Sequence, residues 1–162
     1  MPSWSEFSTA APQLAERVAA RLDAHTHKTI ATIRADGAPR ISGTETRIDG
    51  GELWIGSMWR ALKALDLQRD PRYALHSGSD DPPAWSGDAK VAGTVEEIHD
   101  PETVDRLNGE AAQGGPSHLF RLDIADACHE GTNQLVIRFA NTTRNFVTSD
   151  HAPFGIQAVR LF

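Results

Sequence analysis

Closely spaced turn signals confine the chain, from residue 28 onward, to short strands joined by tight connections. Asp36-Gly37 and Asp49-Gly50-Gly51 are residue types that accept the left-handed backbone of hairpin turns. They separate three runs with the composition of strands, at residues 29–34, 39–48 and 52–56. Three strands joined by two close turns predict an antiparallel meander.

Helical and strand patterns alternate after this meander. Residues 60–69 have helical spacing, and Asp70-Pro71 is expected to end the helix because a residue before proline disfavours the α region. Asp100-Pro101-Glu102 begins another predicted helix, which ends by Gly114-Gly115. Residues 77–85 are rich in Ser, Gly, Asp and Pro and predict an exposed loop. Further strands are predicted at residues 72–76, 88–98, 118–124 and 134–139.

The first 27 residues are predicted to be helical. Ser3 can cap a first short helix, and Pro12 suits the first turn of a second one, where its missing N–H is not needed. Leu14, Val18 and Leu22 recur every four residues, which gives the second helix one apolar stripe.

Six or seven strands with only short helices between them indicate one mainly β (α+β) domain over residues 1–162. A closed barrel is favoured, because closure removes exposed strand edges. Residues 1–27 supply the N-terminal helices. The C-terminal segment, residues 140–162, has no pattern from which we predict a structure.

Charge and composition exclude several classes of protein. The formal net charge of −6 argues against non-specific binding to nucleic acid. No apolar run approaches the ~20 residues of a membrane span, and the first residues lack a signal-peptide pattern, so we expect a cytoplasmic protein. The single cysteine, Cys128, excludes an intramolecular disulfide and a cysteine metal cluster. His25 and His27 have no indicated third ligand, so no metal site is predicted.

The segment from residue 56 to 65 carries the clearest functional signal. A predicted strand ends there and a predicted helix begins, with the hydroxyl of Ser57 at the junction. Arg60 and Lys63 lie three residues apart, so they would share one face of the helix's first turns. A helix N-terminus with two cations suits a phosphate group. In the alternative interpretation, both cations are ordinary solvated surface residues.

The order of elements and the spacing of Ser57, Lys63 and Asp70-Pro71 resemble the flavin-binding split barrels, typified by pyridoxamine 5'-phosphate oxidase. The resemblance covers about residues 14–137. It implies a six- to seven-stranded antiparallel split β-barrel with short flanking helices. It also implies a homodimer that holds FMN, or alternatively a deazaflavin coenzyme, in a groove between the subunits.

The resemblance further implies roles for individual residues. Ser57 and Lys63 would contact the cofactor phosphate, and Arg60 can replace the family's arginine, whose position is Leu62 here. Lys90 would reach the edge of the flavin ring, near Asp88, which takes the place of a family glutamine. Trp59 and Trp85 can stack on the cofactor or be ordinary, partly exposed residues. Backbone groups of the second strand would line the ring at Arg40, Ile41, Ser42 and Gly43.

The implied activity is that of a flavin-dependent oxidoreductase, with hydride transfer at flavin N5 and a small-molecule substrate that the sequence does not identify. One alternative is a non-catalytic module that carries or senses a flavin or deazaflavin. Another is a dimeric scaffold with an empty site. Residues that select the substrate are expected in the loop at 77–86 and in the C-terminal segment.

Overall fold

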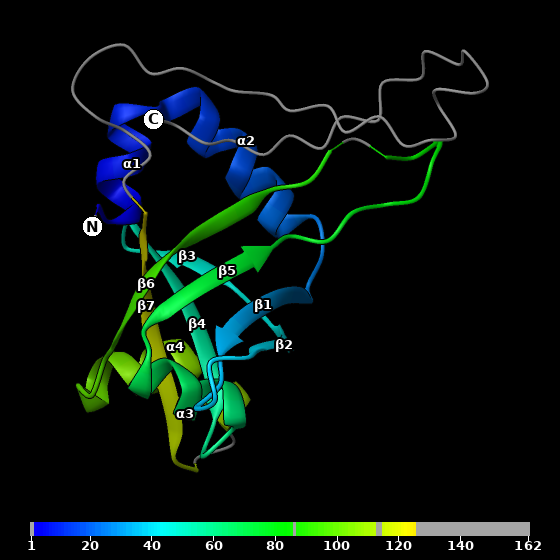
Figure 1. The fold of residues 1–162 in the computed structure, drawn as a ribbon. Coiled ribbons are helices and arrows are strands. Elements are labelled where there is room, and N and C mark those ends of the chain that lie inside the picture. Colours follow the sequence, from blue (N-terminus) through cyan, green and yellow to red (C-terminus); the bar gives the residue numbers. More distant parts are fainter. Residues whose placement is uncertain (1, 86, 113–114, 126–162) are drawn as a thin grey trace.

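The computed structural model describes residues 2–85, 87–112 and 115–125. The expectations for Cys128, for a strand at 134–139 and for residues 140–162 lie outside this part of the chain. Helices α1 (Trp4–Ala10) and α2 (Pro12–Asp23) come first, followed by seven strands and two further helices (Figure 1). In the described residues, no helix is both long and apolar enough to cross a bilayer.

The two N-terminal helices form as their sequence predicts. Ser3 and Glu6 make a reciprocal capping box, in which the hydroxyl accepts from the Glu6 N–H and the carboxylate accepts from the Ser3 N–H. Pro12 stands at the first turn of α2. Leu22 is fully buried, and Leu14 and Val18 pack against the core. The predicted apolar stripe of α2 is therefore confirmed.

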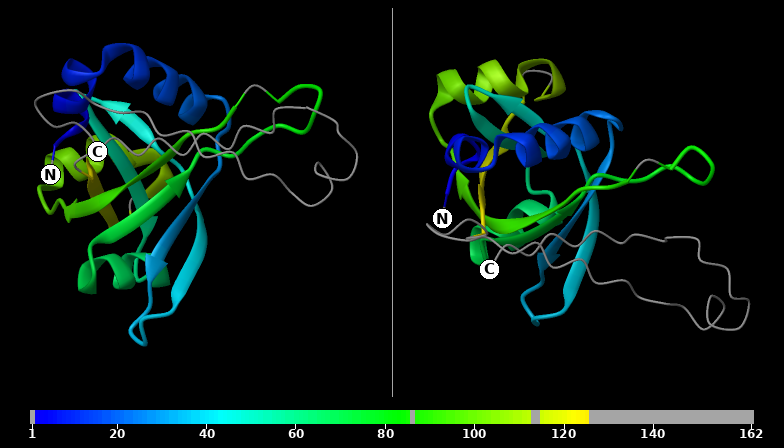
Figure 2. Two further views of the ribbon diagram at one scale, coloured as in Figure 1. Left: turned by 45° about the horizontal axis from the view of Figure 1, so that its top comes forward. Right: turned by 90° about the horizontal axis from the view of Figure 1, so that it is seen from above.

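The strands form one antiparallel sheet that curls into a split barrel (Figure 2). Its order is β2-β1-β5-β6-β7-β4-β3, so the two edge strands, β2 and β3, are consecutive in sequence. The short connection at Glu45 and Thr46 can join opposite edges only because the sheet curls back on itself. The strands are β1 (Lys28–Ile33), β2 (Pro39–Thr44), β3 (Arg47–Asp49), β4 (Glu52–Met58), β5 (Arg72–His76), β6 (Lys90–Glu97) and β7 (Ser117–Ile124).

The predicted meander is wrong in one respect. Residues 39–48 do not form one strand, because the ladder breaks at Glu45 and Thr46. β2 pairs with β1, whereas β3 pairs with β4, so the second predicted strand is divided between two ladders. The two hairpin turns themselves are confirmed: Gly37, Gly50 and Gly51 all have positive φ. Closure of the barrel demands the break, since one run of chain must serve both edges.

The main core fills the inside of the curled sheet. Side chains of one parity along the strands are buried there, including Ile30, Leu53, Leu75 and Phe120. Helices α1 and α2 cover one end of the barrel, and Trp4 and Phe7 of α1 join the core.

The other two helices pack near the opposite end (Figure 1). α3 (Leu62–Arg69) contacts β1 and β4. α4 (Pro101–Ala112) covers the outside of β4 and β7, where Trp54, Leu107 and Leu119 form a second, smaller core. Its first turn is capped by Asp100, which accepts a hydrogen bond from the Thr103 N–H at 2.9 Å. The structure thus places both short helices beside the end of β4.

Candidate functional site

The junction between β4 and α3 contains a buried hydroxyl that has no partner. Ser57 is 8% exposed, and its Oγ makes no hydrogen bond to any described residue. Ser57 lies directly opposite His118 on the neighbouring strand β7, so both side chains are on the inner face of the sheet. Buried polar atoms are normally hydrogen-bonded, so an unpaired hydroxyl at a strand end marks a place where a ligand can bind.

The turn between β4 and α3 differs from the prediction. α3 begins at Leu62 and not at residue 60, and Arg60 adopts a left-handed backbone with φ of 57°. Arg60 and Lys63 therefore do not share a helix face, and that part of the phosphate argument is wrong. The helix N-terminus is nevertheless open, because Ala61 at the N-cap has no side chain that could cap it.

Lys63 links α3 to the edge strand β2. Its Nζ donates a hydrogen bond to the Gly43 carbonyl oxygen at 2.7 Å. Burial lowers the pKa of the Lys63 ammonium, and the nearby Glu45 carboxylate opposes that shift. The structure thus brings together two parts of the predicted site, the lysine expected to bind the phosphate and the strand expected to line the ring. A half-buried ammonium with one carbonyl partner retains two N–H donors for an anion.

The four predicted residues of β2 alternate between the two faces of the sheet. Arg40 and Ser42 lie opposite the buried Thr32 and Ile30, on the inner face. Ile41 points outward and is 75% exposed, and no atom lies within 4 Å of a Cβ built on Gly43. As an edge strand, β2 leaves half of its backbone groups outside the ladder.

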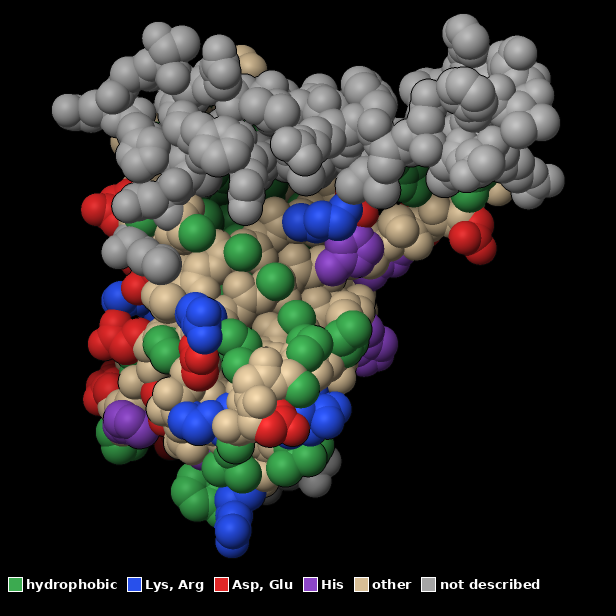
Figure 3. Space-filling model, viewed as in Figure 1, with side chains coloured by type: hydrophobic (Ala, Val, Ile, Leu, Met, Phe, Trp, Pro, Cys, Tyr) green, Lys and Arg blue, Asp and Glu red, His purple; other side chains and the backbone are tan. Residues whose placement is uncertain are grey.

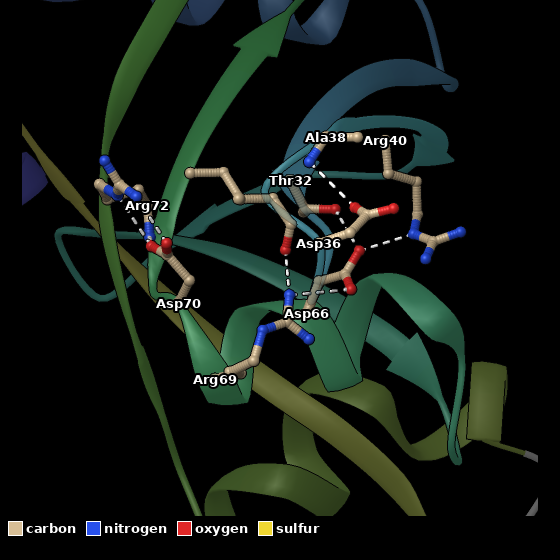
Figure 4. Close-up of polar contacts among 9 residues, drawn as sticks. Thr32, Asp36, Ala38, Arg40, Asp66, Arg69, Asp70 and Arg72 are labelled. Atoms are coloured by element: carbon tan, nitrogen blue, oxygen red, sulfur yellow. Dashed lines mark hydrogen bonds and ion pairs between the residues drawn. The ribbon is translucent and has the colours of Figure 1, made fainter.

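The Arg40 side chain serves to anchor α3. Its Nε donates to Asp66 Oδ2 at 2.6 Å, and Thr32 Oγ1 donates to the same oxygen at 2.9 Å (Figure 4). Arg69 donates to Asp66 Oδ1 and to the Ile33 carbonyl. Burial alone would raise the pKa of Asp66, but the hydrogen bonds from these three side chains outweigh burial and lower it. This cluster fixes α3, and with it Lys63, against the β1–β2 hairpin.

Lys90 lies in the same transverse row of the sheet as Gly43 but three strands away. The row runs Gly43, Thr29, His76 and Lys90, which corresponds to roughly 14 Å along a sheet. Lys90 Nζ donates to Asp88 Oδ2 at 2.8 Å, and His76 Nε2 is 2.6 Å from the same oxygen. The other oxygen of Asp88 is buried without a partner among the described residues. Lys90 is therefore three strands away from Gly43, whose carbonyl oxygen Lys63 contacts.

The two predicted tryptophans lie in different surroundings. Trp85 is 38% exposed. Trp59 is 56% exposed and stacks on the His118 ring, with a centroid distance of 4.9 Å and an interplanar angle of 10°.

The sequence pattern alone indicates that His118 is an ordinary structural histidine. Its one distinguishing signal is a position near the start of a predicted strand, which does not reveal the cross-strand pairing with Ser57.

The outer face of strands β2, β1, β5 and β6 is not covered by any described helix. Figure 3 shows hydrophobic side chains spread across the middle of this side of the molecule. We call this surface the outer face. Strand pairing and exposure assign to it Thr29, Ala31, Ile41, Gly43, Ala74 and Ala92.

The histidines near the end of α2 have separate acidic partners. His25 Nε2 lies 3.7 Å from Asp80, and His27 Nδ1 lies 3.6 Å from Glu45. Within residues 2–85, 87–112 and 115–125, no three His, Cys, Asp or Glu side chains are grouped as ligands for a metal ion.

Comparisons with solved structures identify proteins with the same fold. A conserved hypothetical protein of Mycobacterium tuberculosis aligns with a TM-score of 0.55 and 19% identity, over 68% of this chain and 79% of that one. A putative pyridoxamine 5'-phosphate oxidase of Listeria innocua gives 0.54 and 18%, over 70% and 94%. HutZ, the heme storage protein of Vibrio cholerae, gives 0.53 and 15%, over 72% and 91%. No curated protein matches the chain in sequence.

The family assignment comes from the sequence itself. The profile described as pyridoxamine 5'-phosphate oxidase matches residues 14–127, which include every described strand and the junction at Ser57. The seven-stranded antiparallel split barrel agrees with that match. The chain belongs to the pyridoxamine 5'-phosphate oxidase family.

Proposed function

We propose that this protein is an FMN-dependent oxidoreductase of the pyridoxamine 5'-phosphate oxidase family that acts on a small molecule. The observation that carries the proposal is the junction of β4 and α3. There a buried hydroxyl without a partner, an uncapped helix N-terminus and a half-buried ammonium group belong to one short segment, residues 57–63. Each of these groups gains a partner if an anion binds.

The residues of this corner fit the phosphate of a flavin nucleotide. Ser57 can donate its hydroxyl proton, and Lys63 can donate two N–H groups beyond its bond to Gly43. The lowered pKa of Lys63, caused by burial, shows that its charged form is incompletely solvated. A bound phosphate would supply the missing stabilisation. The exposed side chain of Arg60 can add a further cation from the adjoining turn.

The sheet fits the ring of the same cofactor. Gly43 leaves open space above β2, so a flat ring can approach the backbone at Ile41 and Gly43. Lys90 and Asp88 lie at the far end of the same row of residues. Asp88 offers a buried carboxylate oxygen without a partner, and Lys90 offers an ammonium group. These groups suit the polar edge of a ring whose phosphate is held at Lys63.

A bound flavin supplies hydride transfer at its N5 atom. The residues of this chain bind the phosphate, orient the ring and limit access of water. We assign no side chain as a general acid or base, because hydride transfer to or from the cofactor does not require one.

We also propose that the protein is a homodimer, with the cofactor held where the two copies meet. The outer face exposes small and apolar residues, including Ile41, without a covering helix in the described part of the chain. Such a surface is typical of one that packs against another protein. It carries Ile41 and Gly43, so a second copy would cover the proposed ring site.

Substitution of Lys63 by alanine tests the proposed phosphate site. We expect Lys63→Ala to weaken FMN by roughly 10- to 100-fold, because a charge-assisted hydrogen bond contributes about 1.5–3 kcal/mol. Riboflavin lacks the phosphate and should be affected little. Titration calorimetry with both ligands measures the two dissociation constants.

The matched control is Lys90→Ala, which removes a lysine at the other end of the same row. It should weaken FMN and riboflavin by equal factors, since Lys90 is assigned to the ring. Equal losses of both ligands with Lys63→Ala would place Lys63 away from the phosphate and overturn the assignment. Rapid reduction of the bound flavin by a nicotinamide donor distinguishes an oxidoreductase from a carrier, and an absorption spectrum distinguishes FMN from a deazaflavin.

A further inference from the structure

A chain of polar contacts runs under the turn that precedes α3. Gln68 Nε2 donates to Glu97 Oε2 at 2.9 Å, and Glu97 Oε1 lies 2.6 Å from His118 Nδ1. On the other side of the ring, the Arg60 N–H donates to His118 Nε2 at 3.2 Å. His118 is 4% exposed and is covered by the Trp59 ring. The chain connects β6 and β7 to the backbone between Ser57 and Lys63.

These contacts determine the tautomer of His118. Because Nε2 accepts the Arg60 N–H, that nitrogen carries a lone pair and no proton. The ring proton is then on Nδ1 and is donated to Glu97. Burial alone would raise the pKa of Glu97, but hydrogen bonds from Gln68 and His118 outweigh burial and lower it. An ionised Glu97 is the acceptor that this tautomer requires.

The turn between β4 and α3 needs contacts that stabilise its backbone conformation. Arg60 has a left-handed backbone, which brings the Cβ of a residue with a side chain too close to its carbonyl oxygen and is therefore unfavourable. Its N–H bond to His118 and the stacking of Trp59 on the same ring are the contacts that favour this conformation. The turn determines how the buried hydroxyl of Ser57 is placed relative to α3.

We propose that His118 is a positioning residue for the anion site, acting through the Arg60 backbone, and that its protonation weakens anion binding. The proposal rests on the proposed phosphate site. A proton on Nε2 replaces the lone pair that accepts the Arg60 N–H, so the turn loses its anchor as the pH falls. The charged groups around the ring are Glu97 on β6, with His99 at 3.8 Å from that carboxylate, and Arg60 itself. Asn108 of α4 is uncharged and holds the His118 carbonyl oxygen.

The first experiment uses the ligand-free protein and does not depend on the phosphate site. As the pH is lowered from 8 to 5, any shift of the Arg60 amide resonance in wild type should follow the shift of the His118 ring signals. His118→Gln can present an amide oxygen to the same N–H but does not titrate, so the Arg60 resonance should stay constant. An Arg60 resonance that does not follow the His118 titration would overturn the proposal.

The second experiment measures the dissociation constants of FMN and riboflavin over the same pH range. For each ligand, we take the ratio of the wild-type dissociation constant to that of His118→Gln. This ratio cancels the ionisation of the phosphate itself, because both proteins bind the same ligand. This ratio should rise about five- to tenfold for FMN as the pH falls, and not for riboflavin. His118→Phe keeps a ring under Trp59 but no acceptor, so it should weaken FMN about five- to tenfold even at pH 8.

The experiments distinguish a failure of the proposed phosphate site from a failure of the His118 proposal. If Lys63→Ala leaves FMN affinity unchanged, the phosphate site is wrong, whatever the Arg60 resonance shows. If Lys63→Ala behaves as expected but FMN binds more tightly to wild type at low pH, His118 acts as a cation on the ligand and not as a support for the turn. Equal losses of FMN and riboflavin in His118→Phe would indicate a general structural role and would also contradict the proposal.

Discussion

Two charged residues less than one helical turn apart on α3 have opposite surroundings. Asp66 receives hydrogen bonds from Arg40, Thr32 and Arg69 and is 3% exposed. Lys63 has one carbonyl partner and a pKa lowered by burial. A fully satisfied carboxylate stabilises the fold, whereas an incompletely solvated ammonium favours a ligand. The helix therefore carries its structural anchor and its proposed binding residue side by side.

Removal of the Asp66 charge should destabilise the protein. We expect Asp66→Asn to lower the free energy of unfolding by about 2–4 kcal/mol, because Arg40 loses its buried anionic partner. Chemical denaturation measures this change. The matched control is Asp70→Asn, whose partner Arg72 is largely exposed and which should have a much smaller effect. A similar loss of unfolding free energy in both variants would show that the Asp66 cluster contributes no more to stability than an exposed ion pair.

The same carboxylate should contribute to acid sensitivity. The pKa of Asp66 is lower in the folded protein than in the unfolded chain, where it is about 3.9. Its contribution to stability is therefore fully present above pH ~4 and is lost as the pH falls through the folded pKa. Thermal melts from pH 7 to pH 2 should show a shallower acid decline for Asp66→Asn than for wild type. Parallel profiles for the two proteins would contradict this assignment.

At the scale of elements, β6 depends on close backbone approach at Gly93, where it is paired with both β5 and β7. A Cβ on Gly93 would lie 1.9 Å from the Asp123 carbonyl oxygen, which is far inside any allowed contact. The two strands are adjacent there, and the Ala125 N–H donates to the Ala92 carbonyl at 2.7 Å. Glycine is required at this position because the backbone of Asp123 and Ala125 leaves no room for a Cβ.

Gly93→Ala should therefore cost about 3 kcal/mol or more in the free energy of unfolding, because backbone must move to admit the methyl group. Gly43→Ala is the matched control, since a Cβ there meets no atom within 4 Å. It should leave stability unchanged or slightly improved. It should nevertheless weaken riboflavin and FMN alike, if the ring approaches β2 as proposed. Tolerance of alanine at residue 93 would show that the sheet does not require this close approach.

At the scale of the whole molecule, the outer face determines the proposed assembly. Ile41→Glu places a charge on this surface, and we expect it to convert a homodimer into a monomer in sedimentation velocity. Met58→Glu is the control, because Met58 is 80% exposed but belongs to β4, outside the outer face. Dissociation by Met58→Glu alone would place the interface elsewhere, and a monomeric wild type would refute the dimer.

Most elements could be predicted from local patterns. The capping box at Ser3, the proline at the start of α2 and the hairpin glycines act within a few residues, so the sequence reveals them directly. The spacing of Ser57, Lys63 and Asp70-Pro71 likewise indicates the family from one short segment of the chain. These signals are local, and local signals can be read without knowledge of the fold.

The remaining features depend on residues far apart in the sequence. The sequence pattern extends α3 back to residue 60, because it cannot reveal that His118 anchors the Arg60 N–H across 58 residues. The bond between the Arg40 side chain and Asp66 joins two elements 26 residues apart, so no local pattern reveals it.

The sequence alone determined where the chain turns, where most of the described helices and strands lie, and which family it belongs to, because short-range sterics and hydrogen bonds decide these features. Only the tertiary structure decided that β2 and β3 become opposite edges of one curled sheet, and that Ser57 lies beside His118. The physical reason is that barrel closure is a property of all seven strands together, and no segment of the chain encodes it separately.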